Sequence, residues 1–246
     1  QTKWRLGKPN RVSGQCSLDY LNSAVEFLKK KKISALVTAP VCKEAIAKFQ
    51  PHFQGHTEYL ADHFNKKNVG MLFVAQNLKT LIVTRHIPLK RVSQSITSSL
   101  LVKSIQMTDQ ALKDYFKIKR PRLAICGLNP HAGENGLLGR EEQRIIIPVI
   151  KKLHSNRLHI EGPFPADTLF CPDKAKHYDA IIAMYHDQGL IPIKTLYFHK
   201  VVNLTIGLPV IRTSPSHGTA FDIAGKNCAN PASMIEAIKL AAQLAP

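Results

Sequence analysis

Three histidines follow apolar stretches of the sequence in the same way. His86 follows LIVTR, His131 follows LAICGLNP, and His186 follows IIAMY. Open α/β sheets place their ligand crevices at the carboxyl ends of the strands, so these side chains can converge there. Imidazole is the commonest ligand for zinc and similar metals, and three protein ligands with one open position form a catalytic zinc site. The pattern predicts a divalent-metal site, with Asp187 as an outer neighbour of His186.

Other side chains suit an anionic ligand. The stretch from Gly55 to Glu58 (GHTE) places an imidazole and a hydroxyl where a helix is expected to begin, and a helix N-terminus attracts anions. An alternative interpretation is that Thr57 simply caps this helix. Arg212, in IRTSP, carries a planar fork of donors that matches carboxylate or phosphate. The loop LNPHAGENG around His131 is polar and rich in glycine, which favours a ligand loop over a plain turn.

Strand-like and helix-like stretches alternate along the chain. Ser17 is the expected N-cap of the first helix, Gly189 is the expected turn after the strand that precedes His186, and a proline-rich loop is expected after residue 207. The alternation predicts an α/β fold with a largely parallel sheet. Strands are expected at 33–38, 69–74, 78–84, 122–128, 180–184 and 201–207, and helices at 18–28, 44–49, 92–116 with a possible break, 141–153 and 232–244.

The bulk composition narrows the class of protein. A chain of 246 residues can form one large domain or two smaller ones. A net charge of +17 favours anionic partners, namely nucleic acid, anionic lipid or phosphorylated small molecules. The five cysteines are scattered and form no CxxC pair, which predicts a reducing cytoplasm. No apolar run reaches the length of a membrane span, so no membrane partner is expected.

Six motifs together resemble the PdxA family of 4-hydroxythreonine-4-phosphate dehydrogenases, from about Val12 to the end of the chain. They are GHTEYLADHF, TRHIPL, LNPHAGENGLLGREE, GPFPADTLF, AMYHDQGLIPIK and VNLTIGLPVIRTSPSHGTAFDIAG. The resemblance implies the two-lobed α/β/α fold of the isopropylmalate dehydrogenases, whose cofactor loop is similar to HGTAFDIAGKNCANPASMI. Residues 1–246 would form one catalytic unit of two intertwined lobes. Residues 55–190 would be roughly the substrate, metal and dimer lobe, and the remainder, especially 190–246, the cofactor lobe.

One departure from the family pattern concerns the start of the chain. Family members usually open with a segment of the GDPAGIGPE type, and nothing like it is present here. Roughly the first quarter of the expected chain is therefore predicted to be missing, which would leave the cofactor lobe incomplete at its N-terminus.

The resemblance also implies a reaction and its residues. The reaction is the NAD(P)-dependent oxidation and decarboxylation of 4-phosphohydroxy-L-threonine to 3-amino-2-oxopropyl phosphate, in pyridoxal 5'-phosphate (vitamin B6) biosynthesis. His86, His131 and His186 match the family's ligands for zinc, magnesium or cobalt, in a homodimer that completes each metal site across the subunit interface. We interpret Lys194 as a proton donor or as an extra positive charge on the substrate carboxylate, and Asp187 as an aid to proton transfer. The substrate contacts implied are His56, Thr57, Lys194, Asn203 and Arg212.

The cofactor residues are carried over from the isopropylmalate dehydrogenase pattern. The chain has no GxGxxG, so the usual dinucleotide fingerprint is absent and the sequence alone does not name a dinucleotide. The implied NAD or NADP contacts are His217, Gly218, Thr219, Ala220, Asp222 and Asn230.

Two alternatives remain open. A sister dehydrogenase acting on threonate or erythronate 4-phosphate, or on a diol acid, would keep the same three histidines. A relative of another class would bind nucleic acid through its positive charge without catalysis. The presence of every ligand-type histidine and its loop argues against this second alternative.

Overall fold

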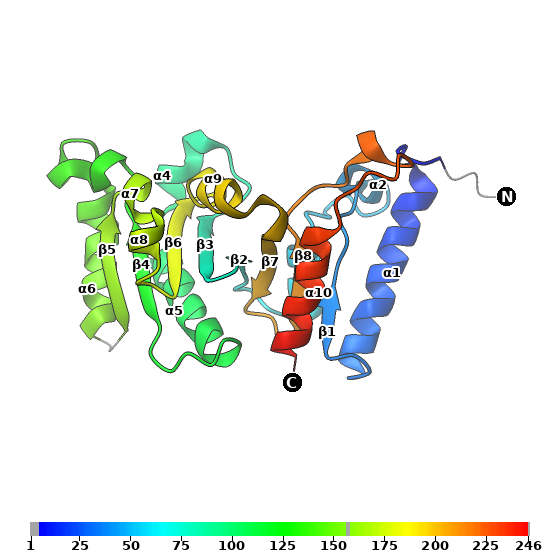
Figure 1. Ribbon diagram of the computed structural model, residues 1–246, viewed down its shortest axis with the longest axis horizontal. Coiled ribbons are helices and arrows are strands. Elements are labelled where there is room, and N and C mark those ends of the chain that lie inside the picture. Colours follow the sequence, from blue (N-terminus) through cyan, green and yellow to red (C-terminus); the bar gives the residue numbers. More distant parts are fainter. Residues whose placement is uncertain (1–4, 156–157, 246) are drawn as a thin grey trace. The chain divides into compact units, whose positions relative to one another are not determined.

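A computed structural model describes residues 5–155 and 158–245 (Figure 1). The chain divides into two compact units. One is discontinuous, comprising Gln1–Val69 and Val202–Pro246, and the other is the central unit, Gly70–Val201. The lobe boundaries near residues 55 and 190 were drawn from the sequence according to the expected functions of the two lobes. Those functions remain predictions.

The discontinuous unit is built around the strand β8. This strand pairs in parallel with β1 and antiparallel with β7, which gives the order β1-β8-β7. Helix α10 packs against β8. The bounds of the elements are α1 (Arg11–Lys29), β1 (Ala35–Val37), α2 (Lys43–Ala47), α3 (His56–His63), β7 (Val202–Ile206), β8 (Ile211–Pro215), η5 (Phe221–Ile223) and α10 (Ala232–Leu244).

Two predicted helix caps in this unit are wrong. Helix α1 begins at Arg11, where the side chains of Asn10 and Ser13 form a reciprocal capping box. Ser17 therefore lies inside α1, and its hydroxyl donates to the carbonyl oxygen of Ser13. Helix α3 begins at His56 with Gly55 as N-cap, so Thr57 lies within the first turn and is buried instead of capping the helix.

The central unit contains five strands, which pair in the order β2-β3-β6-β4-β5. Strands β2 and β3 form an antiparallel pair, and the remaining pairs are parallel. The strands are β2 (Gly70–Ala75), β3 (Leu78–Thr84), β4 (Arg122–Cys126), β5 (His159–Phe164) and β6 (Ala180–Tyr185). The helices and turns are η1 (Leu89–Arg91), α4 (Val92–Ser95), α5 (Ser98–Asp114), η2 (Pro130–Gly136), η3 (Glu142–Ile146, a π-helix), α6 (Ile147–Ser155), α7 (Ala166–Leu169), α8 (Pro172–Ala175), α9 (His186–Tyr197) and η4 (Phe198–Lys200).

Buried strands position the three histidines in this unit. Almost every residue of β3, β4 and β6 is buried, because helices cover the faces of a parallel sheet. The parallel pairing of β6 with both β3 and β4 brings the three carboxyl ends to one edge. His86, His131 and His186 follow these three strands, so the prediction that they share a sheet edge is confirmed.

Gly189 has a different role from the predicted one. It lies inside α9 and is buried, so the expected turn at this position is wrong. A Cβ atom built on Gly189 would lie 2.4 Å from Cδ1 of Ile82 and 2.9 Å from Cγ2 of Thr80. Glycine at this position thus lets α9 pack closely against β3, which fixes the start of α9 beside the ends of the strands.

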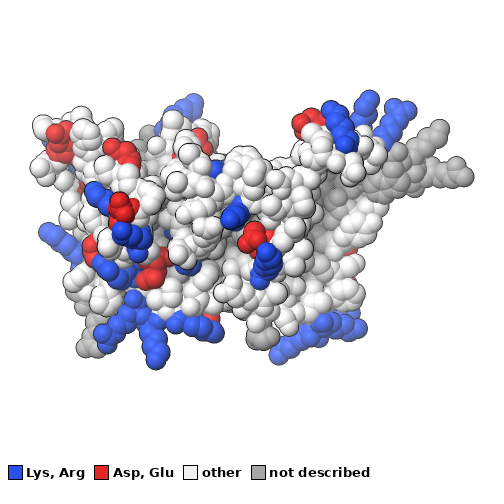
Figure 2. All heavy atoms as spheres, viewed as in Figure 1, with Lys and Arg blue, Asp and Glu red and all other residues white. Residues whose placement is uncertain are grey.

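The distribution of charged side chains and the length of the helices are relevant to the nucleic-acid and membrane partners considered above. Figure 2 shows Lys and Arg side chains in several separate groups on the face drawn, with Asp and Glu side chains among them. Among the helices of the described residues, none is long and apolar enough to cross a membrane.

Candidate active site

His86 and His186 form a close pair at the ends of neighbouring strands. Their ring centroids lie 5.8 Å apart with an interplanar angle of 47°. Nδ1 of His186 lies 2.6 Å from Oδ1 of Asp187. A carboxylate can only accept, so Nδ1 carries the proton, and in the neutral imidazole Nε2 keeps the lone pair that a metal requires. Asp187 thus contacts the imidazole of His186, as expected of its outer neighbour, and the role of the two residues at a metal stays a prediction.

His131 does not join this pair within the chain. Its imidazole is exposed on η2, with Nδ1 3.6 Å from Oε2 of Glu134. Within residues 5–155 and 158–245, no three side chains of His, Cys, Asp or Glu are grouped closely enough to hold a metal. Two of the three predicted ligands are thus brought together. The third would reach a metal only in an assembly of subunits, which remains a prediction.

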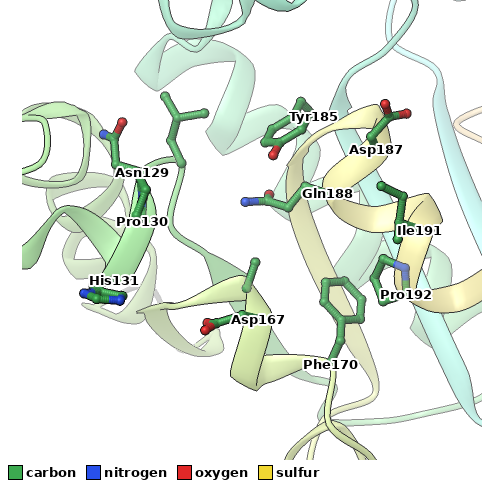
Figure 3. A pocket seen from close by; sticks show the side chains of 12 residues that line it. Asn129, Pro130, His131, Asp167, Phe170, Tyr185, Asp187, Gln188, Ile191 and Pro192 are labelled. Atoms are coloured by element: carbon green, nitrogen blue, oxygen red, sulfur yellow. The ribbon is translucent and has the colours of Figure 1, made fainter. Parts of the chain in front are cut away.

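A pocket of about 560 Å³ opens between η2 and the start of α9 (Figure 3). Asn129, Pro130 and His131 lie on one side, and Tyr185 and Gln188 lie on the other. The remaining lining residues are Leu128, Ala166, Asp167, Phe170, Asp187, Ile191 and Pro192. The pocket therefore adjoins two of the residues predicted from the sequence, His131 and Asp187.

Gln188 ties the two sides of this pocket together. Its Oε1 accepts a hydrogen bond from the backbone N–H of Met184 at 2.7 Å, and its Nε2 donates to the carbonyl oxygen of Gly127 at 2.8 Å. The bonds link the end of β6 to the end of β4. Gln188 was not predicted as a site residue. The only feature of the sequence that could have indicated its role is its position next to His186 and Asp187 in the HDQG motif.

Glu142 is a second side chain that the sequence analysis missed. It is 2% exposed, and its carboxylate accepts three N–H groups. Oε1 accepts from the backbone of Leu128 at 2.7 Å and of Asn129 at 2.8 Å, while Oε2 accepts from Nδ2 of Asn129 at 2.9 Å. The sequence places Glu142 among charged residues at the start of an amphipathic helix, where a solvent-exposed side chain is the usual expectation.

The neighbouring Glu141 binds the same loop. Its Oε1 accepts from the hydroxyl of Ser93 at 2.5 Å, and its Oε2 accepts from Nδ2 of Asn129 at 2.9 Å. The hydrogen bonds from Ser93 and Asn129 lower the pKa of Glu141, because they favour the charged carboxylate. The loop before His131 is thus held by two adjacent carboxylates.

Arg212 lies at the centre of a polar cluster in the discontinuous unit. It is buried on β8, opposite Thr205 of β7. Its NH1 donates to the hydroxyl of Thr205 at 3.0 Å, and its NH2 donates to that of Thr38 at 2.6 Å. Burial lowers the pKa of Arg212 to about 10, against the opposing effect of Glu58, so the guanidinium remains charged at neutral pH.

His56 is held neutral in the same unit. Burial is the largest cause that lowers its pKa to about 3, and the positive charges of Arg212 and Lys43 add to the effect. His56 is also the first residue of α3, and the free N–H groups of a helix N-terminus favour anions. A neutral imidazole, a helix N-terminus and a buried guanidinium therefore combine into a positively polarised region.

Asn203 contributes a buried polar atom to this unit. Its Oδ1 is buried and accepts no hydrogen bond within the described chain. Buried acceptors are normally satisfied, so such an atom indicates a ligand or a water molecule. Asn203 lies two residues before Thr205 on β7, so the two side chains point to the same face of the strand.

A second pocket of about 570 Å³ gathers most of the predicted cofactor residues. His217, Gly218, Thr219 and Ala220 line it, whereas Asp222 and Asn230 do not appear in its lining. Oδ1 of Asn230 accepts from the backbone N–H of Ala232 at 2.9 Å, which supports the start of α10. The other lining residues are Pro40, Ile223, Ala224, Gly225, Asn227 and Ala229.

Lys194 lies on α9 in the central unit and is partly buried. Burial lowers the pKa of its ammonium group, because a desolvated site disfavours the charge. A lysine whose pKa is lowered releases its proton more readily, which is compatible with the predicted role as a proton donor.

The geometry defines an α/β protein with a pocket at the ends of strands that is lined by His131, and with a buried guanidinium on β8 in the other unit. Ligand-binding α/β enzymes place their sites at such strand ends. The family model described as pyridoxal phosphate biosynthetic protein PdxA matches residues 1–241. The chain therefore belongs to the PdxA family, and the resemblance inferred from its motifs is confirmed.

Individual relatives agree with this family. A 4-hydroxythreonine-4-phosphate dehydrogenase of Sulfurihydrogenibium sp. is 45% identical over 236 residues, which is 96% of this chain and 73% of that protein. A protein of Oceanobacillus iheyensis, provisionally named D-threonate 4-phosphate dehydrogenase, is 45% identical over 98% of this chain and 72% of its own length. The crystal structure of the 4-hydroxythreonine-4-phosphate dehydrogenase from Klebsiella pneumoniae has a TM-score of 0.88 at 37% identity, covering 99% of this chain and 74% of that one. The predicted isopropylmalate dehydrogenase-like fold is confirmed by this likeness.

Proposed function

We propose that this protein oxidises and decarboxylates 4-phosphohydroxy-L-threonine to 3-amino-2-oxopropyl phosphate with NAD or NADP, in pyridoxal 5'-phosphate biosynthesis. The observation that carries the proposal is the His86–His186 pair at the carboxyl ends of two parallel strands, in a chain of the PdxA family. Relatives with the corresponding names support the reaction, and a dehydrogenase of this family uses a nicotinamide cofactor.

The imidazoles suit a divalent metal such as zinc, magnesium or cobalt. Asp187 orients His186 through Nδ1, so that Nε2 presents its lone pair to the ion. When bound, such an ion polarises a hydroxyl and a carbonyl oxygen and favours loss of a proton. We assign the third imidazole to His131 and the complete site to a homodimer, because His131 lies apart from the other two within one chain.

Binding of the anionic substrate would use the cluster around Arg212. A guanidinium has five N–H donors, and the bonds to Thr38 and Thr205 use three of them. The remaining donors, together with the N-terminus of α3 at His56 and Thr57, can hold phosphate or carboxylate. The buried Oδ1 of Asn203 requires a donor, which the hydroxyl or ammonium group of the substrate would supply.

Proton transfer is assigned to Lys194 and Asp187. The lowered pKa of Lys194 makes its ammonium a better proton donor to the carbon that has lost carbon dioxide. Asp187 would assist proton transfer through the carboxylate oxygen that does not contact His186. The cofactor is assigned to the pocket at residues 217–220, and a cytoplasmic location follows only from the scattered cysteines.

A second candidate substrate is D-threonate 4-phosphate, favoured by the Oceanobacillus iheyensis relative. The two substrates share the phosphate, the hydroxyl and the carboxylate, and they differ in the amine. The test is NADH formation from each compound by the metal-loaded enzyme, with release of carbon dioxide measured in parallel. We expect the higher kcat/KM for 4-phosphohydroxythreonine. A higher value for threonate 4-phosphate would assign the chain to the second reaction, and turnover of neither would reject both.

A further inference from the structure

The loop that carries His131 has an unusual backbone. His131, Ala132, Glu134 and Asn135 all adopt positive φ angles between 43° and 55°, and Gly133 between them has φ 82°. Side chains with a Cβ atom disfavour the left-handed region, and consecutive residues in it are rare. Such a backbone persists only where its surroundings hold it in place, and it is most often found at functional sites.

Three consecutive side chains provide that support. Glu142 accepts the backbone N–H groups of Leu128 and Asn129, just before the left-handed run. Glu141 binds the side chain of Asn129, and Nε2 of Gln143 donates to the carbonyl oxygen of Asn135 at 2.7 Å, at the end of the run. The sequence EEQ therefore fixes the loop at both ends.

The loop is also shaped around the carboxylate of Glu142. A Cβ atom built on Gly133 would lie 2.6 Å from Oε2 of Glu142, and one built on Gly127 would lie 3.2 Å from Oε1. Glycine at these two positions thus leaves room for the buried carboxylate of Glu142. A residue with a side chain at either position would displace it. Glu142 is the first residue of a π-helix. Such helices are rare in proteins, and those that occur are often at functional sites.

We propose that Glu142 is a positioning residue that holds the left-handed loop and thereby fixes the imidazole of His131. The part of this proposal that concerns metal binding rests on the proposed function, in which His131 is a ligand. Glu142 does not touch the reacting atoms, because its carboxylate is enclosed by the amides of the loop.

The central variant is Glu142→Gln, which preserves the shape but replaces one acceptor oxygen with a donor that faces Nδ2 of Asn129. Gly133→Ala disturbs the same carboxylate from the loop side. We expect amide exchange at Leu128 and Asn129 to accelerate about tenfold or more in both variants. The affinity of the enzyme for Zn²⁺, measured without substrate, should fall about 10- to 100-fold, as for other residues that orient metal ligands.

Two controls separate positioning from stability. Glu161→Gln makes the same chemical change on an exposed carboxylate of β5 and should leave exchange and Zn²⁺ affinity unchanged. The buried amide of Ile125 on β4 reports opening of the whole unit and should exchange at the wild-type rate in every variant. If Ile125 exchange accelerates together with that of Leu128 and Asn129, the role of Glu142 is general stability and the proposal is overturned.

A failure of the proposed function gives a different result. If His131→Ala binds Zn²⁺ as tightly as the wild type, His131 is not a ligand, and the proposed metal site is wrong. The claim for Glu142 is then judged by amide exchange and by the NMR signal of the His131 imidazole, which should shift in Glu142→Gln. Unchanged exchange and an unshifted His131 signal would overturn the positioning role by themselves.

Discussion

His86 and His186 lie side by side, 5.8 Å between ring centroids, although 100 residues separate them in the sequence. The parallel pairing of β3 with β6, in which Thr84 is the partner of Tyr185, brings them together. The hydroxyl of Thr84 also donates to the carbonyl oxygen of Met184 at 2.6 Å, which locks the two strand ends at this register. The pair is therefore a product of sheet topology.

Asp187 should strengthen metal binding through His186. In Asp187→Ala, the imidazole loses the partner that orients it, and we expect the affinity for Zn²⁺ to fall about 10- to 100-fold by calorimetric titration. Asp167→Ala removes an exposed carboxylate from the same pocket and serves as the control. Equal loss of affinity in both variants would indicate a general charge effect and contradict the role of Asp187.

His56 should make stability depend on pH. Its pKa is lowered to about 3 in the folded protein, so between pH 6.5 and 3 the unfolded chain binds a proton that the folded chain does not. Its contribution to stability is therefore complete above pH 6.5 and is lost as the pH falls toward 3, by at most about 1.4 kcal/mol per pH unit.

Urea unfolding at pH 7, 6 and 5 tests this dependence. The variant His56→Gln should show a shallower fall in the free energy of unfolding than the wild type over this range. His52→Gln, at an exposed histidine four residues earlier, should retain the wild-type slope. A wild-type slope in His56→Gln would show that the imidazole is not held neutral.

Arg212 should be required for anion binding. Its hydrogen bonds bridge Thr38 and Thr205, and the single ammonium of a lysine cannot reproduce this fork. We expect Arg212→Lys to weaken binding of inorganic phosphate about 10- to 100-fold, the range for a charged hydrogen bond. Arg120→Lys, on the exposed segment before β4, is the control. Unchanged phosphate affinity in a folded Arg212→Lys protein would remove Arg212 from the substrate site.

Gly218 offers a test of the cofactor pocket. A Cβ atom built on Gly218 has no other atom within 4 Å, so Gly218→Ala should leave the melting temperature unchanged. If the cofactor lies against this backbone, the added methyl group should raise the dissociation constant for NAD about tenfold. NAD binding followed by fluorescence measures the effect. Unaltered affinity would place the cofactor elsewhere.

Periodic apolar segments were predictable from the sequence. The strand at 78–84 and the helix at 232–244 have the predicted bounds. The strand is a short run rich in apolar and β-branched residues, and the apolar residues of the helix recur at helical spacing. The histidines were predictable for the same reason, since each follows such a strand.

Strands without an apolar run were missed. Strand β8, with the sequence IRTSP, is buried throughout, but its polar residues and the nearby prolines resemble a loop. Arg212 and Thr213 become acceptable in a strand because tertiary partners satisfy them, namely the hydroxyls of Thr38 and Thr205 for Arg212 and the carbonyl oxygen of Ala237 for Thr213. Strand β5 is interrupted by Gly162 and Pro163 and lies at the end of the strand order, so it carries little periodic signal.

Residues that act through packing were also missed. Helix α9 contains Gly189 and Pro192, both of which signal an ending, yet Gly189 is needed for close contact with Ile82. Glu142 resembles a surface residue of an amphipathic helix until the loop from Leu128 closes over it. The roles of these two residues depend on which residues lie next to them in the folded protein. The spacing of apolar residues in the sequence carries no information on such neighbours.

The most direct test of the account measures bound metal and NADH formation in parallel for the wild type, His131→Ala and His186→Ala, with 4-phosphohydroxythreonine as substrate. The account predicts that each substitution lowers both the metal content and the rate, while the protein remains folded. NADH formation at the wild-type rate by a variant that has lost its metal would contradict it.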